Sequence, residues 1–338
     1  MSLTVGAPTR VQPVPVPVAP STTPPLSRPH PNRRLGIAAI VISATTMGAA
    51  GLFGRMATPP GAALGEALTL GRMLVGTVGM LLLTVFSRRL GVIRRTRLSP
   101  SIVLGGVFLG LSLATYLSST LLTDLSRAVV LHYLGPLIAT VLARVLLKES
   151  ITRMDALSLV TAFAGMLLAA GLIGGSATAG SDQQTLGTVL GVASGIFYGL
   201  ALLCYRYRSD MPADVRSFWN FAFGAVATAA MVAVTRPDVT GMTGANWAWA
   251  AGFFVVCGLL ALGLLVIAGK HLRAAELSGL SYLEVVVALI FGALAFGESI
   301  SLVAALGAGM IIAAMTLPLV AGRRRRTMAP ATQIAPAV

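Results

Sequence analysis

Residues 131–137 read LHYLGPL, and residues 280–286, 149 positions further on, read LSYLEVV. Each stretch continues through an apolar segment to a second match, ESIT at 149–152 and ESIS at 298–301. The similarity therefore runs over one whole apolar segment in each half of the chain. This pattern predicts a protein built from two related halves.

A second pair of segments repeats with almost the same spacing of 151 positions. Its members are Leu35, Gly36, Gly48, Leu52 and Arg55, which reappear as Leu186, Gly187, Gly199, Leu203 and Arg206. Apolar helices share Leu and Gly by composition alone. The matched polar positions, Tyr133 with Tyr282 and Glu149 with Glu298, favour a true internal repeat.

The composition indicates a membrane protein. Hydrophobic residues make up 56% of the 338, charged residues 11%, and the mean hydropathy is +0.85. A soluble domain averages about 25% charged residues. Apolar runs recur at the length of about 20 residues that an α-helix needs to cross a bilayer. We therefore predict an all-α membrane protein whose surroundings are the lipid bilayer.

Ten transmembrane helices are predicted in two five-helix repeats, residues 35–174 and 186–320, between a Pro-rich tail (1–32) and a basic tail (321–338). The predicted spans are 35–54, 66–86, 101–122, 127–147, 155–174, 186–205, 217–235, 248–269, 274–296 and 301–320. The first tail holds nine of the eighteen prolines and no long apolar run, so we predict a disordered or polyproline-like segment. The connections are short and leave no room for a soluble domain.

The basic residues predict the orientation. Of the 25 Lys and Arg, twenty fall on one side of the ten spans and only Arg55, Arg127 and Arg236 on the other. Loops rich in Lys and Arg stay in the cytoplasm, so both termini are predicted to be cytoplasmic in a multi-pass cell-membrane protein. The net charge of +14 is thereby explained by topology, and no nucleic-acid partner is expected.

Because each half has an odd number of spans, the two halves enter the membrane from opposite sides. Inverted repeats of this kind are typical of secondary transporters, whose halves rock around a central site. The chain resembles the drug/metabolite transporter superfamily, and specifically its EamA-type members. The resemblance rests on the ten spans in two halves, on Arg72 early in the second span, and on a glutamate 13 residues after Pro136 and 14 residues after Glu284. It implies a transporter of small metabolites.

Glu284 is the first candidate for a binding or coupling residue. It lies ten residues into its predicted span, about 15 Å along the helix, where an ionisable side chain is costly. Ser281 is three positions earlier and shares its helix face. Glu284 either faces a cavity or ties helices together. In the matching family motif a Pro usually follows the Glu, whereas Val285 follows here.

The span around LHYLGPL supplies further candidates. Gly135 and Pro136 are predicted to form a hinge, because proline interrupts helical hydrogen bonding. His132 either relays a proton or contacts substrate, or is a hydrogen-bonded core residue. Arg72 can bind a carboxylate or hold a helix terminus. Aromatic and amide groups that could line a cavity are Tyr116, Tyr133, Tyr282, Tyr198, Trp219 and Asn220.

Glu149 and Glu298 each lie where one span ends and the next begins. A carboxylate at this place can cap the free N–H groups of the following helix, so both are interpreted as structural.

We expect alternating-access transport, with export of amino acids or related amphipathic compounds as the most specific prediction and proton coupling as a hypothesis. No GxxxxGK[ST] segment occurs, which argues against ATP hydrolysis by this chain. No cofactor or metal site is predicted. An integral-membrane enzyme acting on lipids or isoprenoids, and a passive channel, remain alternatives. Both a monomer and a homodimer are compatible with the sequence.

Overall fold

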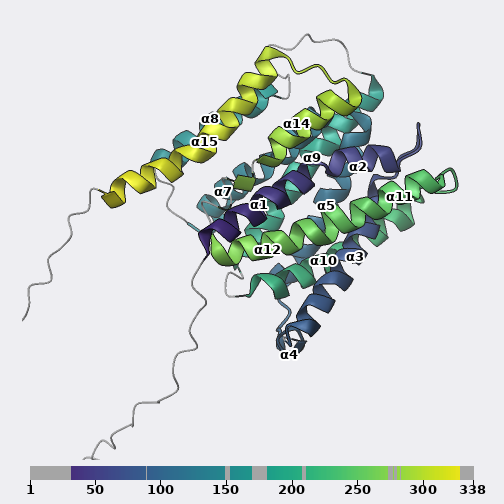
Figure 1. The fold of residues 1–338 in the computed structure, drawn as a ribbon, viewed down its shortest axis with the longest axis horizontal. Coiled ribbons are helices and arrows are strands. Elements are labelled where there is room, and N and C mark those ends of the chain that lie inside the picture. Colours follow the sequence, from purple (N-terminus) through teal and green to yellow (C-terminus); the bar gives the residue numbers. More distant parts are fainter. Residues whose placement is uncertain are drawn as a thin grey trace, which may run out of the picture. The chain divides into compact units, whose positions relative to one another are not determined.

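The computed structural model describes residues 32–88, 90–148, 153–169, 181–207, 211–272, 277, 280–281 and 283–327. All regular elements within these ranges are helical (Figure 1). They are α1 (Arg33–Gly48), α2 (Ala50–Ala57), α3 (Gly65–Phe86), α4 (Leu90–Arg95), α5 (Pro100–Leu122), α6 (Leu125–His132), α7 (Leu134–Leu146), α8 (Arg153–Ala169), α9 (Asp182–Tyr207), α10 (Ala213–Thr235), α11 (Gly244–Gly252), the π-helix η1 (Phe253–Leu260), α12 (Ala261–His271), α14 (Leu283–Phe296) and α15 (Leu302–Thr327).

Seven helical segments in the described part of the chain are long and apolar enough to cross a membrane. They are Arg33–Ala57, Gly65–Phe86, Pro100–Leu122, Leu125–Leu146, Asp182–Tyr205, Asp214–Thr235 and Gly244–Gly269. Leu283–Phe296 and Leu302–Ala314 are shorter apolar helices. The all-helical class is confirmed, whereas the count of ten spans and the inverted repeat stay predictions. The predicted N-terminal tail lies, except for Asn32, outside the described residues.

Several predicted spans agree closely with single helices. The range 66–86 corresponds to α3 and 101–122 to α5, each within one residue. Three others are divided. The span 35–54 breaks at Ala49, 127–147 breaks at Tyr133, and 248–269 contains the π-helical turns of η1.

The break at Tyr133 has a local cause. Pro136 follows three residues later and has no N–H to bond the carbonyl of His132, so the α6 hydrogen-bonding pattern ends there and α7 starts at Leu134. The interruption thus lies one turn before the predicted Gly135–Pro136 hinge. Whether the two residues bend during function stays a prediction.

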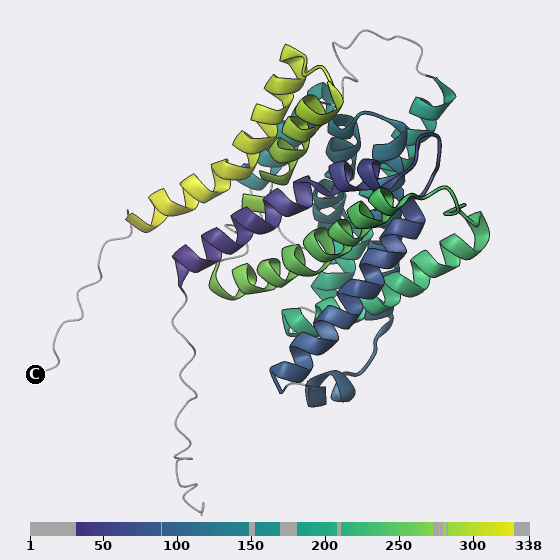
Figure 2. The ribbon, with the colours of Figure 1, turned by 45° about the vertical axis from the view of Figure 1, so that its right-hand side comes forward.

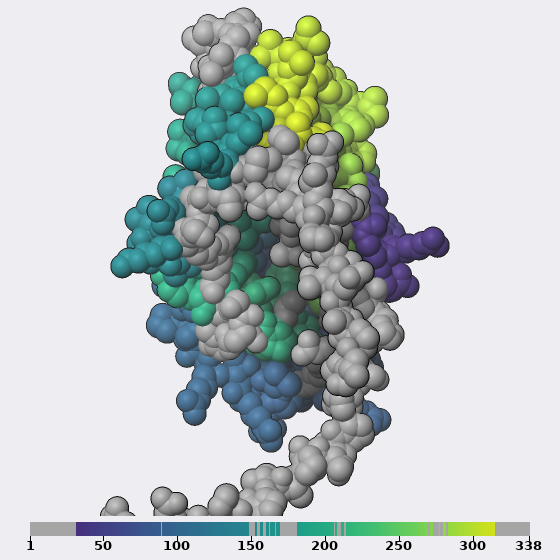
Figure 3. Space-filling view, turned by 90° about the vertical axis from the view of Figure 1, so that its left-hand side faces the viewer, coloured from purple at the N-terminus to yellow at the C-terminus, as the bar shows by residue number. Residues whose placement is uncertain are grey.

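The most extensive helix contacts join the two predicted halves of the sequence. α5 packs on α9 and α10, α3 on α10, α1 on α12, and α8 on α15. Figures 1 and 2 both show α1 beside α12, and Figure 3 shows the yellow surface of α15 against α8. Glycines permit the close approach: a Cβ on Gly110 would lie 2.6 Å from the Gly224 carbonyl oxygen, and one on Gly165 would lie 2.7 Å from that of Gly307.

Candidate functional site

A buried polar cluster brings together six of the residues predicted as site candidates, from helices distant in sequence. Glu284 and Ser281 come from the α14 region, Tyr133 and His132 from the break between α6 and α7, Tyr198 from α9 and Arg72 from α3. Glu284 is 8% exposed and Arg72 only 2%. We call these residues, with Tyr116, the central cluster.

Glu284 is held by Tyr133. The Tyr133 hydroxyl donates a 2.7 Å hydrogen bond to Glu284 Oε2 and lies 3.4 Å from the Ser281 carbonyl oxygen. The Ser281 hydroxyl instead donates to the Leu277 carbonyl, four residues back in its own chain. Ser281 therefore contributes its backbone to the cluster, while its hydroxyl stays with its own segment. Gly48 of α1 lets the backbone of Glu284 approach, since a Cβ there would lie 2.7 Å from the Glu284 carbonyl oxygen.

Arg72 is buried without a full set of acceptors. One terminal nitrogen lies 3.0 Å from the Met47 sulfur, and the guanidinium lies 5.4 Å from the ring centroid of Phe253 in η1. Among the described residues, its Nε has no hydrogen-bond partner. Arg72 and Glu284 lie close enough to interact electrostatically. Sulfur is a weak acceptor, so this guanidinium still has N–H donors that an oxygen acceptor could bind.

His132 is held by Ser194, which is bonded in turn to Ser112, and the sequence singled out neither serine. Ser112 and Ser194 each donate to the other's carbonyl oxygen at 2.9 Å, across the α5–α9 contact. The Ser194 oxygen also lies 2.6 Å from His132 Nδ1. Because the Ser194 proton is already given to Ser112, the hydroxyl must accept from His132, which places a proton on Nδ1. Small polar residues at a glycine-lined helix contact were the only sequence signal for this network.

Aromatic rings enclose the histidine. Tyr198 stacks on His132 with ring centroids 4.7 Å apart and an interplanar angle of 13°, and Tyr116 lies at the same centroid distance. The Tyr116 hydroxyl is buried and has no hydrogen-bond partner in the part of the chain that the structure describes. Tyr282, predicted as the repeat partner of Tyr133, lies outside the described residues.

Trp219 and Asn220 on α10 lie in other surroundings. Trp219 packs against Phe218 and Phe223, beside an apolar group that includes Ile102 and Val215. Its buried Nε1 has no partner. No described contact joins Trp219 to Glu284 or His132, so we leave it out of the central cluster. Asn220 packs by its backbone against Gly106 of α5.

Gly135 has a packing role that is separate from any hinge. A Cβ at this position would lie 2.5 Å from Cδ1 of Tyr198. Glycine is thus required for α7 to seat against the tyrosine that stacks on His132. Pro136 accepts a hydrogen bond from the Thr140 hydroxyl one turn later.

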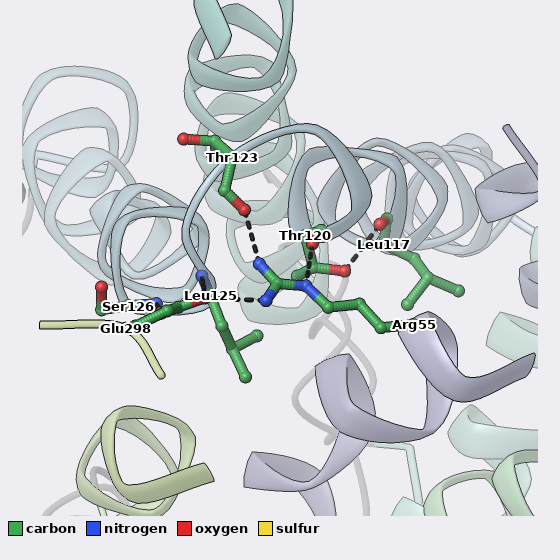
Figure 4. Close-up of polar contacts among 7 residues, drawn as sticks. All are labelled: Arg55, Leu117, Thr120, Thr123, Leu125, Ser126 and Glu298. Atoms are coloured by element: carbon green, nitrogen blue, oxygen red, sulfur yellow. Dashed lines mark hydrogen bonds and ion pairs between the residues drawn. The ribbon is translucent and has the colours of Figure 1, made fainter. Parts of the chain in front are cut away.

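A second arginine and glutamate meet at the outer cluster, which we define as Arg55, Glu298, Thr123 and Asp124. Figure 4 shows the first three of these residues. Arg55 and Glu298 form an ion pair at 2.8 Å. Arg55 also donates to the carbonyl oxygens of Thr120 and Thr123 at 2.6 and 2.7 Å. Its guanidinium lies 4.5 Å from the ring centroid of Phe296.

Glu298 corrects one interpretation made from the sequence. It accepts the backbone N–H groups of Leu125 and Ser126 at 2.7 and 3.3 Å, and so caps α6 instead of the helix that follows it in sequence. That following helix, α15, is served by Ser301, whose hydroxyl accepts the N–H of Ala304. Glu149, its predicted counterpart, lies outside the described residues.

The comparisons with known proteins agree with this architecture. The model of the EamA-like transporter family matches residues 34–171 and again 185–319. The chain belongs to the EamA-like transporter family. This EamA-like protein is also 26% identical over 287 residues to an uncharacterized transporter of Archaeoglobus fulgidus, covering 84% of this chain and 96% of that one. The family and the apolar helices together identify a multi-pass membrane protein that transports small molecules.

A solved structure described only as the crystal structure of a protein matches the fold of this EamA-like chain. Its TM-score is 0.62 at 20% identity, covering 87% of this chain and 98% of that one. At this identity the likeness concerns the fold alone. Within the described residues, no three His, Cys, Asp or Glu side chains gather as a group able to hold a metal ion.

Proposed function

We propose that this protein is a secondary transporter that exports amino acids or related amphipathic compounds by alternating access, with its substrate site at the central cluster. The observation that carries the proposal is the pair of buried, unpartnered donors, Arg72 Nε and the Tyr116 hydroxyl, near the carboxylate of Glu284. An unpaired buried donor costs about 1–3 kcal/mol. Such a cost is understandable at a site that a ligand completes.

The chemistry of the cluster suits a zwitterion. A substrate carboxylate would accept hydrogen bonds from Arg72, whose described hydrogen-bond acceptor is the neutral sulfur of Met47. Glu284, supported by Tyr133, would receive an ammonium group. The faces of Tyr116 and Tyr198 provide apolar area for a side chain. Amphipathic metabolites combine these three features.

The same proposal includes the setting of the transporter. The charge bias of the loops supports a cell-membrane protein with both termini in the cytoplasm. The repeated sequence segments support an inverted pair of halves that rock around the central cluster. The working unit is a monomer or a homodimer.

Proton coupling is assigned to Glu284. A buried carboxylate that a tyrosine holds in place can exchange a proton for a substrate ammonium group as the site changes its exposure. The pH gradient across the membrane then supplies the protons and the driving force for this exchange.

The test uses purified protein in liposomes and a mixture of radiolabelled amino acids. Counterflow and gradient-driven uptake are measured separately. In the wild type, an imposed pH gradient should drive accumulation, and excess unlabelled amino acid should saturate uptake. Glu284→Gln should lose the response to the gradient, and its counterflow should need a higher substrate concentration, because the carboxylate that binds the ammonium group is gone. Glu66→Gln is the matched control, since Glu66 is another buried carboxylate, bonded by Ser118, which is not part of the central cluster.

Two results would overturn the proposal. Uptake that neither saturates nor shows counterflow would indicate a passive channel. A gradient response that survives in Glu284→Gln would remove Glu284 as the coupling residue while leaving transport itself established.

A further inference from the structure

A pocket of about 260 Å³ lies at the outer cluster, away from the central cluster. It is lined by Arg55, Leu121, Leu122, Thr123, Asp124, Gln184, Phe296 and Glu298. These residues come from both predicted halves of the sequence. The volume is just below the range of roughly 300–1,000 Å³ for drug-sized ligands, so the pocket has room for a small organic group.

The donors of Arg55 in the pocket wall are already used. Each nitrogen of the Arg55 guanidinium has an oxygen partner: Thr120, Thr123 or Glu298. Because its charge is paired at 2.8 Å, Arg55 is a poor attractant for an anion. The two oxygens of Glu298 are likewise taken, by Arg55 and by the N–H groups at the start of α6.

Asp124 has no capping role in this arrangement. It occupies the N-cap position of α6, where an aspartate normally accepts an N–H from the first turn. Its side chain makes no capping hydrogen bond, and Glu298 accepts the N–H groups of Leu125 and Ser126 instead. The best local capping residue is thus displaced by a carboxylate from 174 positions away in the sequence (298 − 124).

A second acceptor in the wall is also unsatisfied. Thr123 is 5% exposed, and its Oγ1 is buried with no hydrogen-bond partner. Figure 4 shows this hydroxyl on the opposite side of Thr123 from the carbonyl that Arg55 binds. Gln184, at the start of α9, also lines the pocket, and its side-chain amide contains an acceptor oxygen. The lining charges sum to −1, from Arg55 (+1), Asp124 (−1) and Glu298 (−1).

We propose that this outer pocket is a second binding site, specific for a primary ammonium group. Asp124 supplies the opposite charge, and Thr123 Oγ1 and the Gln184 amide oxygen supply the other two acceptors. An ammonium group has three N–H donors and no acceptor, which matches three acceptors beside a saturated arginine. An ammonium bound here also lies beside Glu298, so it competes with Arg55 for that carboxylate.

The test measures binding and needs no transport, so its failure leaves the proposed function standing. Leu121→Cys places a thiol in the half-buried lining, and its reaction with a membrane-impermeant maleimide is timed in the full-length protein. Wild-type protein corrects for reaction at Cys204 and Cys257. Propylammonium should slow labelling saturably. Propionate, its anionic counterpart, should not.

Asp124→Asn in the same background should raise the half-protecting concentration of propylammonium about tenfold. Asp182→Asn is the matched control, because this exposed acid starts the same helix as Gln184 but does not line the pocket. Thr123→Val, of similar shape, should weaken protection less than Asp124→Asn does. It also provides a second variant if Asp124→Asn does not fold.

Equal protection by propionate, or protection that survives both Asp124→Asn and Thr123→Val, would overturn the site. So would an equal loss in Asp182→Asn, which would show only long-range attraction. Microscale thermophoresis with propylammonium decides the matter if the new cysteine does not react. Binding that is absent at concentrations of about 10 mM, or unchanged by Asp124→Asn, contradicts the proposal.

Discussion

The molecule contains two arginine–glutamate neighbourhoods that use the same residue types in opposite ways. At the outer cluster, Arg55 and Glu298 form a direct ion pair, and every guanidinium nitrogen has an oxygen partner. At the central cluster, Arg72 has a sulfur partner and an unpartnered Nε, although it is the more buried arginine. The Arg55 guanidinium is thus fully paired within the protein, whereas the Arg72 guanidinium is not.

The number of hydrogen-bond partners therefore distinguishes a structural arginine from a functional one, although the residue types are the same. A saturated pair links helices, and Arg55 with Glu298 connects α2, the end of α5 and the start of α6 to the segment after α14. An unsaturated pair keeps its hydrogen-bonding capacity for a ligand. The comparison predicts that removing each arginine has opposite effects on stability and transport.

The largest expected effect comes from Arg55→Met compared with Arg72→Met. Arg55→Met removes three hydrogen bonds and leaves Glu298 without its counter-charge, so the free energy of unfolding should fall by about 3 kcal/mol. Arg72→Met replaces an incompletely bonded buried charge by an apolar side chain of similar length. It should leave stability unchanged or raise it, and abolish transport. Melting of the detergent-solubilised protein, followed by intrinsic fluorescence, measures both.

A double variant sharpens the interpretation. Arg55→Met combined with Glu298→Gln should cost less than the sum of the two single changes, because the pair is lost only once. If Arg72→Met destabilises the protein as strongly as Arg55→Met, the central arginine is a structural residue and the contrast fails.

The sequence predicted the helices well but not these pairings. Helices α3 and α5 follow from runs of about 20 apolar residues, a local property of the chain. The break at Tyr133 follows from Pro136, which is also local. The π-helical turns of η1 were not predictable, because no residue type in Phe253–Leu260 marks a change of hydrogen-bonding register.

The candidate site was predicted only in part, for a physical reason. Glu284, Arg72 and His132 were found because charged or titratable groups in apolar spans are costly wherever they lie. Glu298 was assigned to the helix that follows it, whereas Ser301 has that local role and Glu298 reaches α6. Contacts between residues 243 positions apart, such as Arg55 with Glu298, depend on the packing of the helices.

The next prediction concerns how closely α1 must approach the central cluster. In Gly48→Ala, the new Cβ would lie 2.7 Å from both the Glu284 carbonyl oxygen and Val287 Cβ. This overpacking should cost about 2 kcal/mol and displace Glu284, so that transport falls along with stability. Gly263→Ala is the matched control, because this helical glycine has nothing within 4 Å of the new Cβ. It should be neutral or stabilise by up to about 1 kcal/mol.

If Gly48→Ala melts like the wild type, α1 yields at this contact and does not position Glu284. A Gly48→Ala protein that is stable but transports less would instead show that Glu284 moves by an amount too small to lower the melting temperature.

The smallest expected effect tests whether His132 has a structural role, like Arg55, or a functional role, like Arg72. It lies in the central cluster, yet its Nδ1 proton is bound by Ser194 as completely as the nitrogens of Arg55 are bound. Ser194→Ala should therefore lower the free energy of unfolding by about 1 kcal/mol, because it leaves a buried donor unpaired. Thr188→Val on the same helix should change little, since its hydroxyl bonds only to the Gln184 carbonyl of its own helix. A Ser194→Ala protein that melts normally but transports with an altered pH dependence would show that His132 has a functional role, as proposed for Glu284.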